Sequence, residues 1–177
     1  STINTLHLIE IDAHLAFGTG THETTQMVCE TLLEEPLKGK NLLDAGCGTG
    51  ILGISALKLG ASSVTAYDID EWSSENVHHN AVINRVDQHI KTMCGDASLL
   101  DTLHERFDYV LANINRNILL QDMPRFREVM KPDGTLILSG FYIEDIPLLE
   151  KKGKELGITL VRQRDNNNWA CIIMRVQ

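Results

Sequence analysis

Residues 42–50 read Leu-Leu-Asp-Ala-Gly-Cys-Gly-Thr-Gly, an apolar run that passes into a glycine-rich turn. A helical pattern follows, and a second apolar run ends in Tyr-Asp-Ile-Asp at residues 67–70. This order predicts a strand–helix–strand unit, because apolar runs suit buried parallel strands and glycines suit the turn between strand and helix. Glycine also lets a backbone pass close to a bound molecule without a clash from Cβ. The unit therefore predicts a site for a nucleoside.

Individual positions of this unit carry separate roles. The turn holds Gly46, Gly48 and Gly50, preceded by Asp44. The N–H groups at the start of the next helix have no partner inside that helix and would point at the ligand. Asp68 ends the second apolar run, and ligands of open parallel sheets bind at the carboxyl ends of strands. We interpret the four loop positions as ligand contacts and Asp68 as an acceptor for ribose hydroxyls, with a strand-end cap as its alternative.

The spacing of the glycines indicates which nucleoside is bound. A dinucleotide-binding loop reads G-x-G-x-x-G, whereas this loop reads G-x-G-x-G and continues with Ile51. The close helix approach that a pyrophosphate requires is therefore not offered at that position. The form D-x-G-x-G-x-G resembles the nucleotide loop of class I S-adenosylmethionine-dependent methyltransferases. A dehydrogenase loop or a chance match of the short motif is the alternative.

Strand and helix patterns alternate along the chain. The expected strands are residues 41–45, 63–69, 90–94, 107–114, 135–141, 159–164 and 169–176. The expected helices are residues 22–34, 49–59, 71–84, 118–130 and 146–156. Alternation predicts a mainly parallel sheet with helices on both faces. The predicted fold class is α/β: a three-layer, doubly wound, mostly parallel seven-stranded sheet with an antiparallel C-terminal hairpin, Rossmann-like as in class I methyltransferases.

Turn signals complete this assignment. The polar tetrad at residues 165–168 separates two strand patterns and predicts the terminal hairpin, hence one antiparallel strand. A dehydrogenase sheet of six parallel strands would not end in this way. Pro132-Asp133-Gly134 predicts a turn before the fifth strand. Near the N-terminus, residues 5–11 predict a strand and residues 16–21 a glycine–threonine loop.

Composition narrows the class of protein. The chain has 177 residues, 43% of them hydrophobic, and a net charge of −8. No apolar run reaches the length of about 18 residues that suggests a membrane span, and no signal peptide is visible. We therefore expect no membrane association. The acidic balance argues against direct nucleic-acid binding through phosphate neutralisation.

The four cysteines form no C-x-x-C pair. This spacing suits neither a zinc site nor a disulfide framework, so we expect no metal and a reducing compartment, the cytoplasm. Cys47 is interpreted as a small buried side chain beside the ligand rather than a nucleophile, because no histidine stands nearby in sequence to activate it. His78 and His79 are expected on a helix surface.

Three polar residues follow the third and fourth predicted strands. Asp96 is interpreted as an acceptor for an adenine amino group, with a turn residue as its alternative. Asn113 ends the fourth strand, beside the switch point of the sheet, and its amide can orient an incoming amine or the cofactor. Asn115 faces the same chemistry, with a helix cap as its alternative.

A second glycine-rich segment precedes the first helix. Residues 16–22 read Ala-Phe-Gly-Thr-Gly-Thr-His, and Thr24 and Thr25 supply hydroxyls in the first turn of that helix. A helix N-terminus favours a carboxylate, and the carboxylate of a methionine group is a fitting partner. A flexible loop is the alternative.

Taken together, these stretches resemble the family of methyltransferases that modify ribosomal protein L11. Residues 16–22 with Thr24 and Thr25 are similar to the family signature. The resemblance continues in LDAGCGTGIL at 43–52, ALKLGA at 56–61, DID at 68–70, ANI at 112–114, LSG at 138–140 and the terminal Trp169. It covers nearly the whole chain from about residue 13. The sequence departs from the family at Asn115, where leucine is usual, and at Glu23, where proline is frequent.

The resemblance implies a cofactor, a substrate and a domain plan. The cofactor is S-adenosyl-L-methionine, with contacts at the positions that match Thr25, Gly46, Asp68 and Asn113, and the methyl acceptors are lysine or α-amino nitrogens of ribosomal protein L11. Residues 1–38 are expected to form a segment with the cofactor-contacting loop and helix, and residues 39–177 the methyltransferase domain, within one globular unit. The family carries a small upstream domain that grips the ribosomal protein, and we expect this chain to be the catalytic domain without it.

Alternatives from other classes remain at this stage. A methyltransferase for glutamine side chains or nucleic-acid bases places Asn-Pro-Pro-Tyr or a close variant after the fourth strand, whereas residues 113–116 read Asn-Ile-Asn-Arg. Another class I methyltransferase with a small-molecule acceptor, or a non-catalytic cofactor-binding module, is also compatible with the pattern. We name no catalytic acid or base, because alignment of a neutral amine with the methyl donor supplies much of the rate.

Overall fold

The computed structural model describes residues 22–177, in which strands alternate with helices. The strands are β1 (Asn41–Ala45), β2 (Ser63–Asp68), β3 (Ile90–Cys94), β4 (Phe107–Asn113), β5 (Met130–Tyr142), β6 (Ile158–Asn166) and β7 (Trp169–Val176). The helices are α2 (His22–Leu33), α3 (Ile51–Lys58), α4 (Ser73–Ile83), α5 (Arg116–Glu128) and α6 (Ile146–Glu155), with short 3-10 helices η1 (Asp87–His89), η2 (Ala97–Thr102) and η3 (Ile143–Asp145). The strand and loop expected at residues 5–11 and 16–21 lie outside the described residues.

The described strands form one sheet in the order β3-β2-β1-β4-β5-β7-β6. Neighbouring strands from β3 to β5 are parallel, and β7 runs antiparallel to both β5 and β6. From β1 the chain builds one side of the sheet through β2 and β3. It then returns to the other side of β1 with β4, and the later strands continue outward from there. The resulting switch point between β1 and β4 is where open α/β sheets bind ligands. The predicted fold class, including the single antiparallel strand, is confirmed.

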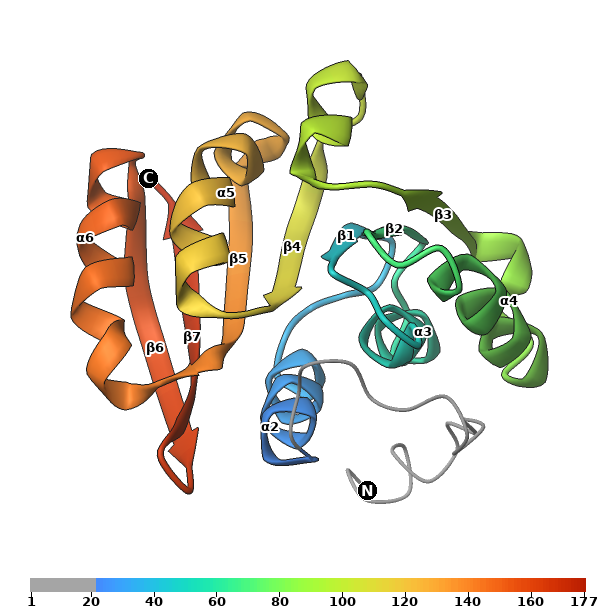
Figure 1. The fold of residues 1–177 in the computed structure, drawn as a ribbon, viewed down its shortest axis with the longest axis horizontal. Coiled ribbons are helices and arrows are strands. Elements are labelled where there is room, and N and C mark those ends of the chain that lie inside the picture. Colours follow the sequence, from blue (N-terminus) through green and yellow to red (C-terminus); the bar gives the residue numbers. More distant parts are fainter. Residues whose placement is uncertain (1–21) are drawn as a thin grey trace.

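Helices cover both faces of the sheet (Figure 1). Helices α5 and α6 pack on one face, and α2, α3 and α4 pack on the other. Successive strand residues serve the two faces in turn, since side chains alternate along a strand. In β1, for example, Leu42 packs with α2 and α3 whereas Leu43 packs with α5. Burial on both faces explains why the central strands read as continuous apolar runs.

Helix boundaries differ from the prediction by about two residues, for local reasons. Helix α3 begins at Ile51 rather than residue 49, because Gly50 is its N-cap and adopts a left-handed conformation with φ of 85°. Helix α5 begins at Arg116 rather than residue 118, because Asn115 caps it by accepting a hydrogen bond from the Ile118 N–H. In both cases the N-cap residue, which precedes the helix, determines where the helix begins.

The turn predicted at Pro132-Asp133-Gly134 is wrong, since these residues lie within strand β5. Strand β5 begins already at Met130, which pairs with Phe107 of β4. The register then shifts before Tyr109 pairs with Thr135. The proline–glycine signal therefore marks an irregularity inside a long strand rather than its start.

The terminal hairpin has a tighter turn than the predicted tetrad. Asn166 pairs with Trp169, which leaves two residues in the loop. These residues, Asn167 and Asn168, have φ of 50° and 70°. Two successive positive φ values are typical of the type I′ turn, whose twist matches that of the flanking strands, and asparagine tolerates them.

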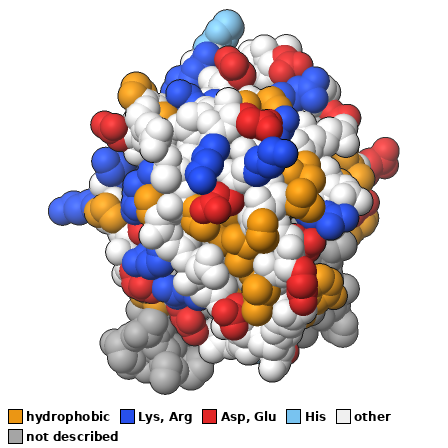
Figure 2. Space-filling view, turned by 90° about the vertical axis from the view of Figure 1, so that its left-hand side faces the viewer, with side chains coloured by type: hydrophobic (Ala, Val, Ile, Leu, Met, Phe, Trp, Pro, Cys, Tyr) orange, Lys and Arg blue, Asp and Glu red, His pale blue; other side chains and the backbone are white. Residues whose placement is uncertain are grey.

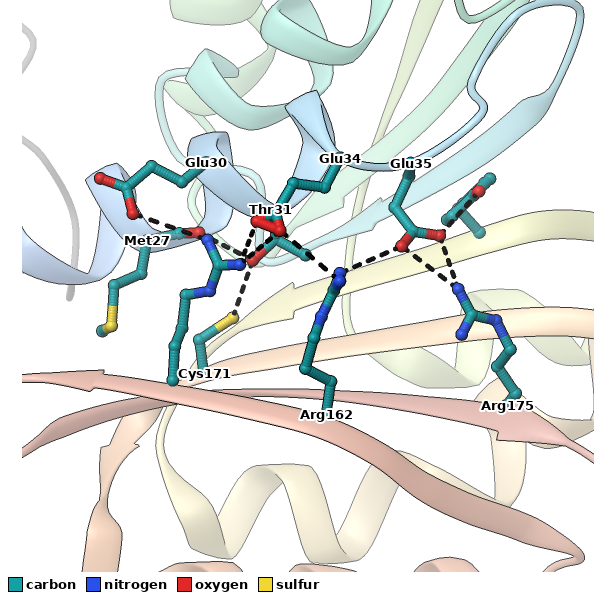
Figure 3. Close-up of polar contacts among 10 residues, drawn as sticks. Met27, Glu30, Thr31, Glu34, Glu35, Arg162, Cys171 and Arg175 are labelled. Carbon is teal, nitrogen blue, oxygen red and sulfur yellow. Dashed lines mark hydrogen bonds and ion pairs between the residues drawn. The ribbon is translucent and has the colours of Figure 1, made fainter. Parts of the chain in front are cut away.

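Helix α2 is tied to the C-terminal strands by charged side chains (Figure 3). Glu35, just beyond the helix, accepts hydrogen bonds from Arg175 at 2.9 Å and from the Tyr109 hydroxyl at 3.0 Å, and it also pairs with Arg162. Glu34 pairs with Arg164 of β6. The side chain of Glu35 is only 4% exposed, so this carboxylate is a buried anchor between α2 and the sheet.

The surface over α6 and β6 carries charges of both signs. Figure 2 shows basic and acidic side chains interspersed on this face, with a group of hydrophobic side chains between them. The net negative charge of the chain is therefore not gathered into one patch on this side. Among the described helices, none has the length and apolar character needed to cross a membrane.

Candidate active site

A pocket of about 550 Å³ opens at the carboxyl ends of β4, β1, β2 and β3. Residues at or just after these four neighbouring strands line it in the order Asn113, Gly46, Asp68 and Asp96. Adjacent strands lie about 4.8 Å apart, so this row spans about 14 Å. The lining includes all but one of the predicted site residues: Thr25, Asp44, Gly46, Gly48, Asp68, Asp96, Asn113 and Asn115. The sheet thus brings together residues that lie far apart in sequence.

The glycine loop is fastened to the end of β2. The N–H groups of Gly46 and Cys47 both donate to the carbonyl oxygen of Tyr67, at 2.9 and 3.0 Å. Gly46 and Gly48 have φ of 70° and 53°. A Cβ on Gly48 would meet no atom within 4 Å, so the loop backbone faces open space there. A ligand can therefore approach this backbone closely.

Gly50 lies outside the pocket lining, in contrast to its prediction as a ligand contact. It caps α3 with φ of 85°, and a Cβ there would lie 3.0 Å from the side chain of Val77 on α4. Its small size serves the packing of α4 against the start of α3. Helix packing therefore requires a glycine at this position.

Asp68 holds the glycine loop by a hydrogen bond and also lines the pocket. One carboxylate oxygen accepts a hydrogen bond from the Gly48 N–H at 2.8 Å, and the other accepts from the Asp70 N–H at 3.0 Å. The alternative, a strand-end cap that bonds the next helix, is not observed in these two bonds, because both donors precede α4 or belong to the glycine loop. A carboxylate has about four acceptor positions, so lone pairs remain for two ribose hydroxyls. The loop contact also fixes the direction of the side chain.

Asp44 is a buried carboxyl group in the wall of the pocket. Asp44 is only 2% exposed, and its carboxyl group accepts a hydrogen bond from the Gly53 N–H at 3.2 Å. Burial, together with the nearby charge of Asp68, raises the pKa of Asp44 to about 7. Near neutral pH this group is therefore poised between its neutral and charged forms.

Asn113 and Asn115 differ in how strongly they are held. The side-chain oxygen of Asn113 accepts a hydrogen bond from the Ser139 hydroxyl at 3.0 Å, which fixes the amide at the end of β4. Asn115 is exposed, and its side-chain oxygen caps α5 at the Ile118 N–H. Both line the pocket, and the helix-cap alternative is observed for Asn115.

Asp96 caps η2 at the far end of the row. Its carboxylate accepts a hydrogen bond from the Ser98 N–H at 2.9 Å and another from the Ser98 hydroxyl. These bonds lower the pKa of Asp96, so the group is charged. The turn-residue alternative is therefore observed, although Asp96 also lines the pocket.

Cys47 and the adjacent pair His78 and His79 match the roles expected of them. Cys47 is buried, and this burial, with the charges of Asp44 and Asp68, raises the pKa of its thiol far above the usual range. His78 and His79 are exposed on α4, as predicted. Within residues 22–177, no cluster of three or more histidine, cysteine or acidic side chains could hold a metal ion.

Sequence reasoning missed several residues of the pocket. Ile69 and Trp72 line its mouth although they are 70% and 44% exposed, and Ile118 of α5 joins them. Apolar residues directly after the acid of β2 were a signal that could have found the first two. Tyr67 and Asp122 also line the pocket, and no local pattern distinguishes them from core and helix-surface residues.

The strand order, the glycine loop after β1 and the acid at the end of β2 define a Rossmann-like α/β protein of the class I methyltransferase type. Comparison with known families gives the same class. The model of the family "Ribosomal protein L11 methyltransferase (PrmA)" matches residues 3–177. The chain belongs to this family.

Individual relatives agree with the assignment. A ribosomal protein L11 methyltransferase of Porphyromonas gingivalis is 52% identical over 162 residues, which are 92% of this chain and 55% of the relative. One from Phocaeicola vulgatus is 47% identical over 171 residues, 97% of this chain and 60% of the relative. The chain thus spans just over half the length of these curated relatives.

Solved structures show the same fold. A ribosomal protein L11 methylase from Lactobacillus delbrueckii subsp. bulgaricus superposes with a TM-score of 0.86 at 32% identity, covering 96% of this chain and 86% of that one. A magnesium protoporphyrin IX methyltransferase from Synechocystis, solved with bound S-adenosylmethionine, superposes with a TM-score of 0.68 at 20% identity, covering 87% of this chain and 78% of that one. The second likeness concerns the fold alone.

Proposed function

We propose that this chain binds S-adenosyl-L-methionine and transfers its methyl group to lysine or α-amino nitrogens of ribosomal protein L11. The observation that carries the proposal is the row of Asn113, Gly46, Asp68 and Asp96 along one pocket. Family membership supports the substrate class. We also propose that the reaction takes place in the cytoplasm, because all four cysteines are free thiols, and that the enzyme does not bind nucleic acid directly.

The residues present fit this cofactor. The pocket volume of about 550 Å³ lies within the usual range for small-molecule sites. Asp68 offers acceptors for ribose hydroxyls in the middle of the row, and the open backbone at Gly48 allows close approach. Thr25 and Asn113 lie at the end where the methionine group would be placed. When bound, the cofactor supplies an electrophilic methyl group on a sulfonium sulfur.

The contribution of the protein to such a reaction is alignment. The acceptor amine must be neutral, although a free lysine has a pKa of about 10.4, and removal from water in the pocket lowers that value. A nitrogen–carbon bond forms as the carbon–sulfur bond breaks, and the new ammonium group then loses its proton to solvent. Asn113, held by Ser139, is our candidate for orienting the amine, and Asn115 offers its NH₂ group nearby.

Calorimetric titration tests the cofactor assignment. The chain should bind S-adenosylmethionine or S-adenosylhomocysteine and give no response to NAD. Asp68→Ala should weaken binding by about 1.5–3 kcal/mol, the range for a lost hydrogen bond to a charged group. Asp87→Ala, a surface acid on η1, is the matched control and should bind like the parent. Binding of NAD alone would overturn the proposal.

Methylation assays test the acceptor. Mass spectrometry of ribosomal protein L11 incubated with the chain and cofactor should show added methyl groups on amino nitrogens. The full-length Porphyromonas gingivalis relative is the reference. We propose that it turns over L11 faster at similar cofactor affinity, because docking by a separate domain raises the effective concentration of substrate. Methylation of glutamine side chains or of nucleic acid instead of L11 amines would assign a different acceptor class.

A further inference from the structure

One polar atom of the pocket wall has no partner. Tyr67 precedes Asp68 on β2, is only 4% exposed and lines the pocket. Within residues 22–177, its hydroxyl makes no hydrogen bond, although the atom is buried. A buried hydroxyl without a partner has given up its hydrogen bonds to water without replacement, which destabilises the folded protein. Such a group in a binding pocket points to a ligand that completes its hydrogen bonding.

A second buried polar group lines the same pocket and comes from helix α5. Asp122 lies on α5, is 8% exposed and lines the same pocket. Among the charged groups, Asp122 contributes most to raising the pKa of Tyr67, yet the two side chains are not hydrogen-bonded to each other. Burial raises the pKa of both side chains. A hydroxyl donor on β2 and a carboxyl acceptor on α5 thus line the same pocket.

The position of this pair along the row indicates which part of a ligand it meets. Tyr67 packs in the same apolar cluster as Ala97 of η2 and Leu119 of α5, on the α5 side of the sheet. Ala97 and Asp96 follow β3, beyond the ribose acceptor Asp68. A nucleoside whose sugar lies at Asp68 and whose tail extends toward β4 therefore places its base between η2 and α5.

We propose that Tyr67 and Asp122 recognise the edge of the adenine base, a role that rests on the proposed function. The Tyr67 hydroxyl donates to a ring nitrogen of the base, and the Asp122 carboxyl group accepts from the exocyclic amino group beside it. An adenine edge presents this neighbouring acceptor and donor. The pair adds base specificity beside Asp96, of which Ser98 engages only the Oδ1 atom.

Binding of two ligands to three variants tests the proposal. S-Adenosylhomocysteine carries the base, whereas S-ribosylhomocysteine lacks it. Tyr67→Phe should weaken binding of the first ligand about 5- to 10-fold and Asp122→Ala about 10-fold or more. Neither substitution should change binding of the second ligand. Tyr109→Phe is the matched control, because it also removes the hydroxyl of a buried tyrosine. That hydroxyl bonds Glu35, and neither residue lines the nucleoside pocket.

Thermal unfolding separates recognition from a structural role. Without ligand, Tyr67→Phe should unfold at the same or a higher temperature than the parent, because it deletes an unpartnered hydroxyl. Adding S-adenosylhomocysteine should raise the unfolding temperature of Tyr67→Phe by less than it raises that of the parent. Unchanged affinity of both variants for S-adenosylhomocysteine, or equal losses for the two ligands, would refute base recognition while leaving cofactor binding intact. Failure of the parent to bind S-adenosylhomocysteine would instead overturn the proposed function as well.

Discussion

The carboxyl group of Asp44 combines burial with a place in the pocket wall, and its pKa of about 7 makes it sensitive to pH. Its unfolded pKa is about 3.9, so between pH 4 and 7 the folded chain holds a proton that the unfolded chain releases. The free energy of unfolding should therefore fall as pH rises through this window and level off above it, by up to about 4 kcal/mol from this group.

Urea unfolding of the ligand-free protein from pH 4 to 8 measures this effect. Asp44→Asn lacks the titrating group, so the difference between parent and variant isolates its contribution from those of other acids. A cationic cofactor should favour the charged form, and binding near pH 6 should release protons, detectable by calorimetry in buffers of different ionisation heat. Parallel pH profiles for parent and Asn variant would contradict the prediction.

The cysteines provide a second prediction at the level of single residues. Cys94 is exposed, whereas Cys29, Cys47 and Cys171 are buried and burial raises the pKa of each thiol. The thiolate is the reactive form, so the buried residues should be inert in the folded state. Ellman's reagent should titrate one fast thiol in the native protein, and Cys94→Ser should abolish that phase. A fast phase that persists in Cys94→Ser would show that a buried thiol is accessible.

Strand β5 supports the acceptor side of the pocket through a glycine. Gly140 has φ of 92°, and a Cβ there would lie 2.9 Å from backbone atoms of Ile114 and 3.0 Å from the side-chain oxygen of Asn113. Gly140→Ala should therefore cost more than about 2 kcal/mol of stability and weaken cofactor binding, because Asn113 must move. Gly157→Ala shares a positive φ of 75° but meets no atom within 4 Å, so it should cost only about 1–2 kcal/mol and leave binding unchanged.

The attachment of α2 to the sheet is a property of whole elements. Glu35→Ala removes a buried carboxylate and leaves Arg175 and the Tyr109 hydroxyl without their acceptor, so chemical unfolding should show a loss of about 1.5–3 kcal/mol. Glu105→Ala is the control, because its ion pair with Lys91 is exposed at both ends and should contribute about 0–1 kcal/mol. Equal losses in the two variants would show that Glu35 is no anchor.

Elements with strong local signals were predicted closely. Strands β1, β3 and β7 have the predicted ends because glycine and polar residues flank short stretches with strand character. The start of β5 was wrong because Pro132 and Gly134 interrupt the pattern without ending the pairing with β4. Local sequence cannot reveal such pairing, since the partner at Phe107 lies far away in the chain.

Site residues at strand ends could be predicted from the sequence. Site residues whose place in the pocket depends on packing between distant elements could not. Asp68 and Asn113 follow apolar runs, so their place at the pocket could be inferred. Gly50 carries the same local signal as Gly48, yet packing against Val77 places it outside the pocket lining. Tyr67 and Asp122 line the same pocket although they come from β2 and α5, an arrangement that arises from the tertiary structure.

The position of β7 has a consequence for the order of events during synthesis on the ribosome. This strand lies between β5 and β6, although it is made after both. Until residues 169–176 emerge, each of these neighbours has an unpaired edge, the kind of surface that invites aggregation. The lining of the pocket, in contrast, comes from residues 25–122, all of which precede β5. A nascent chain thus carries every described residue of its pocket lining before β5 is made. Asn113 gains its Ser139 partner only with β5, and α2 gains its arginine partners only with β6 and β7.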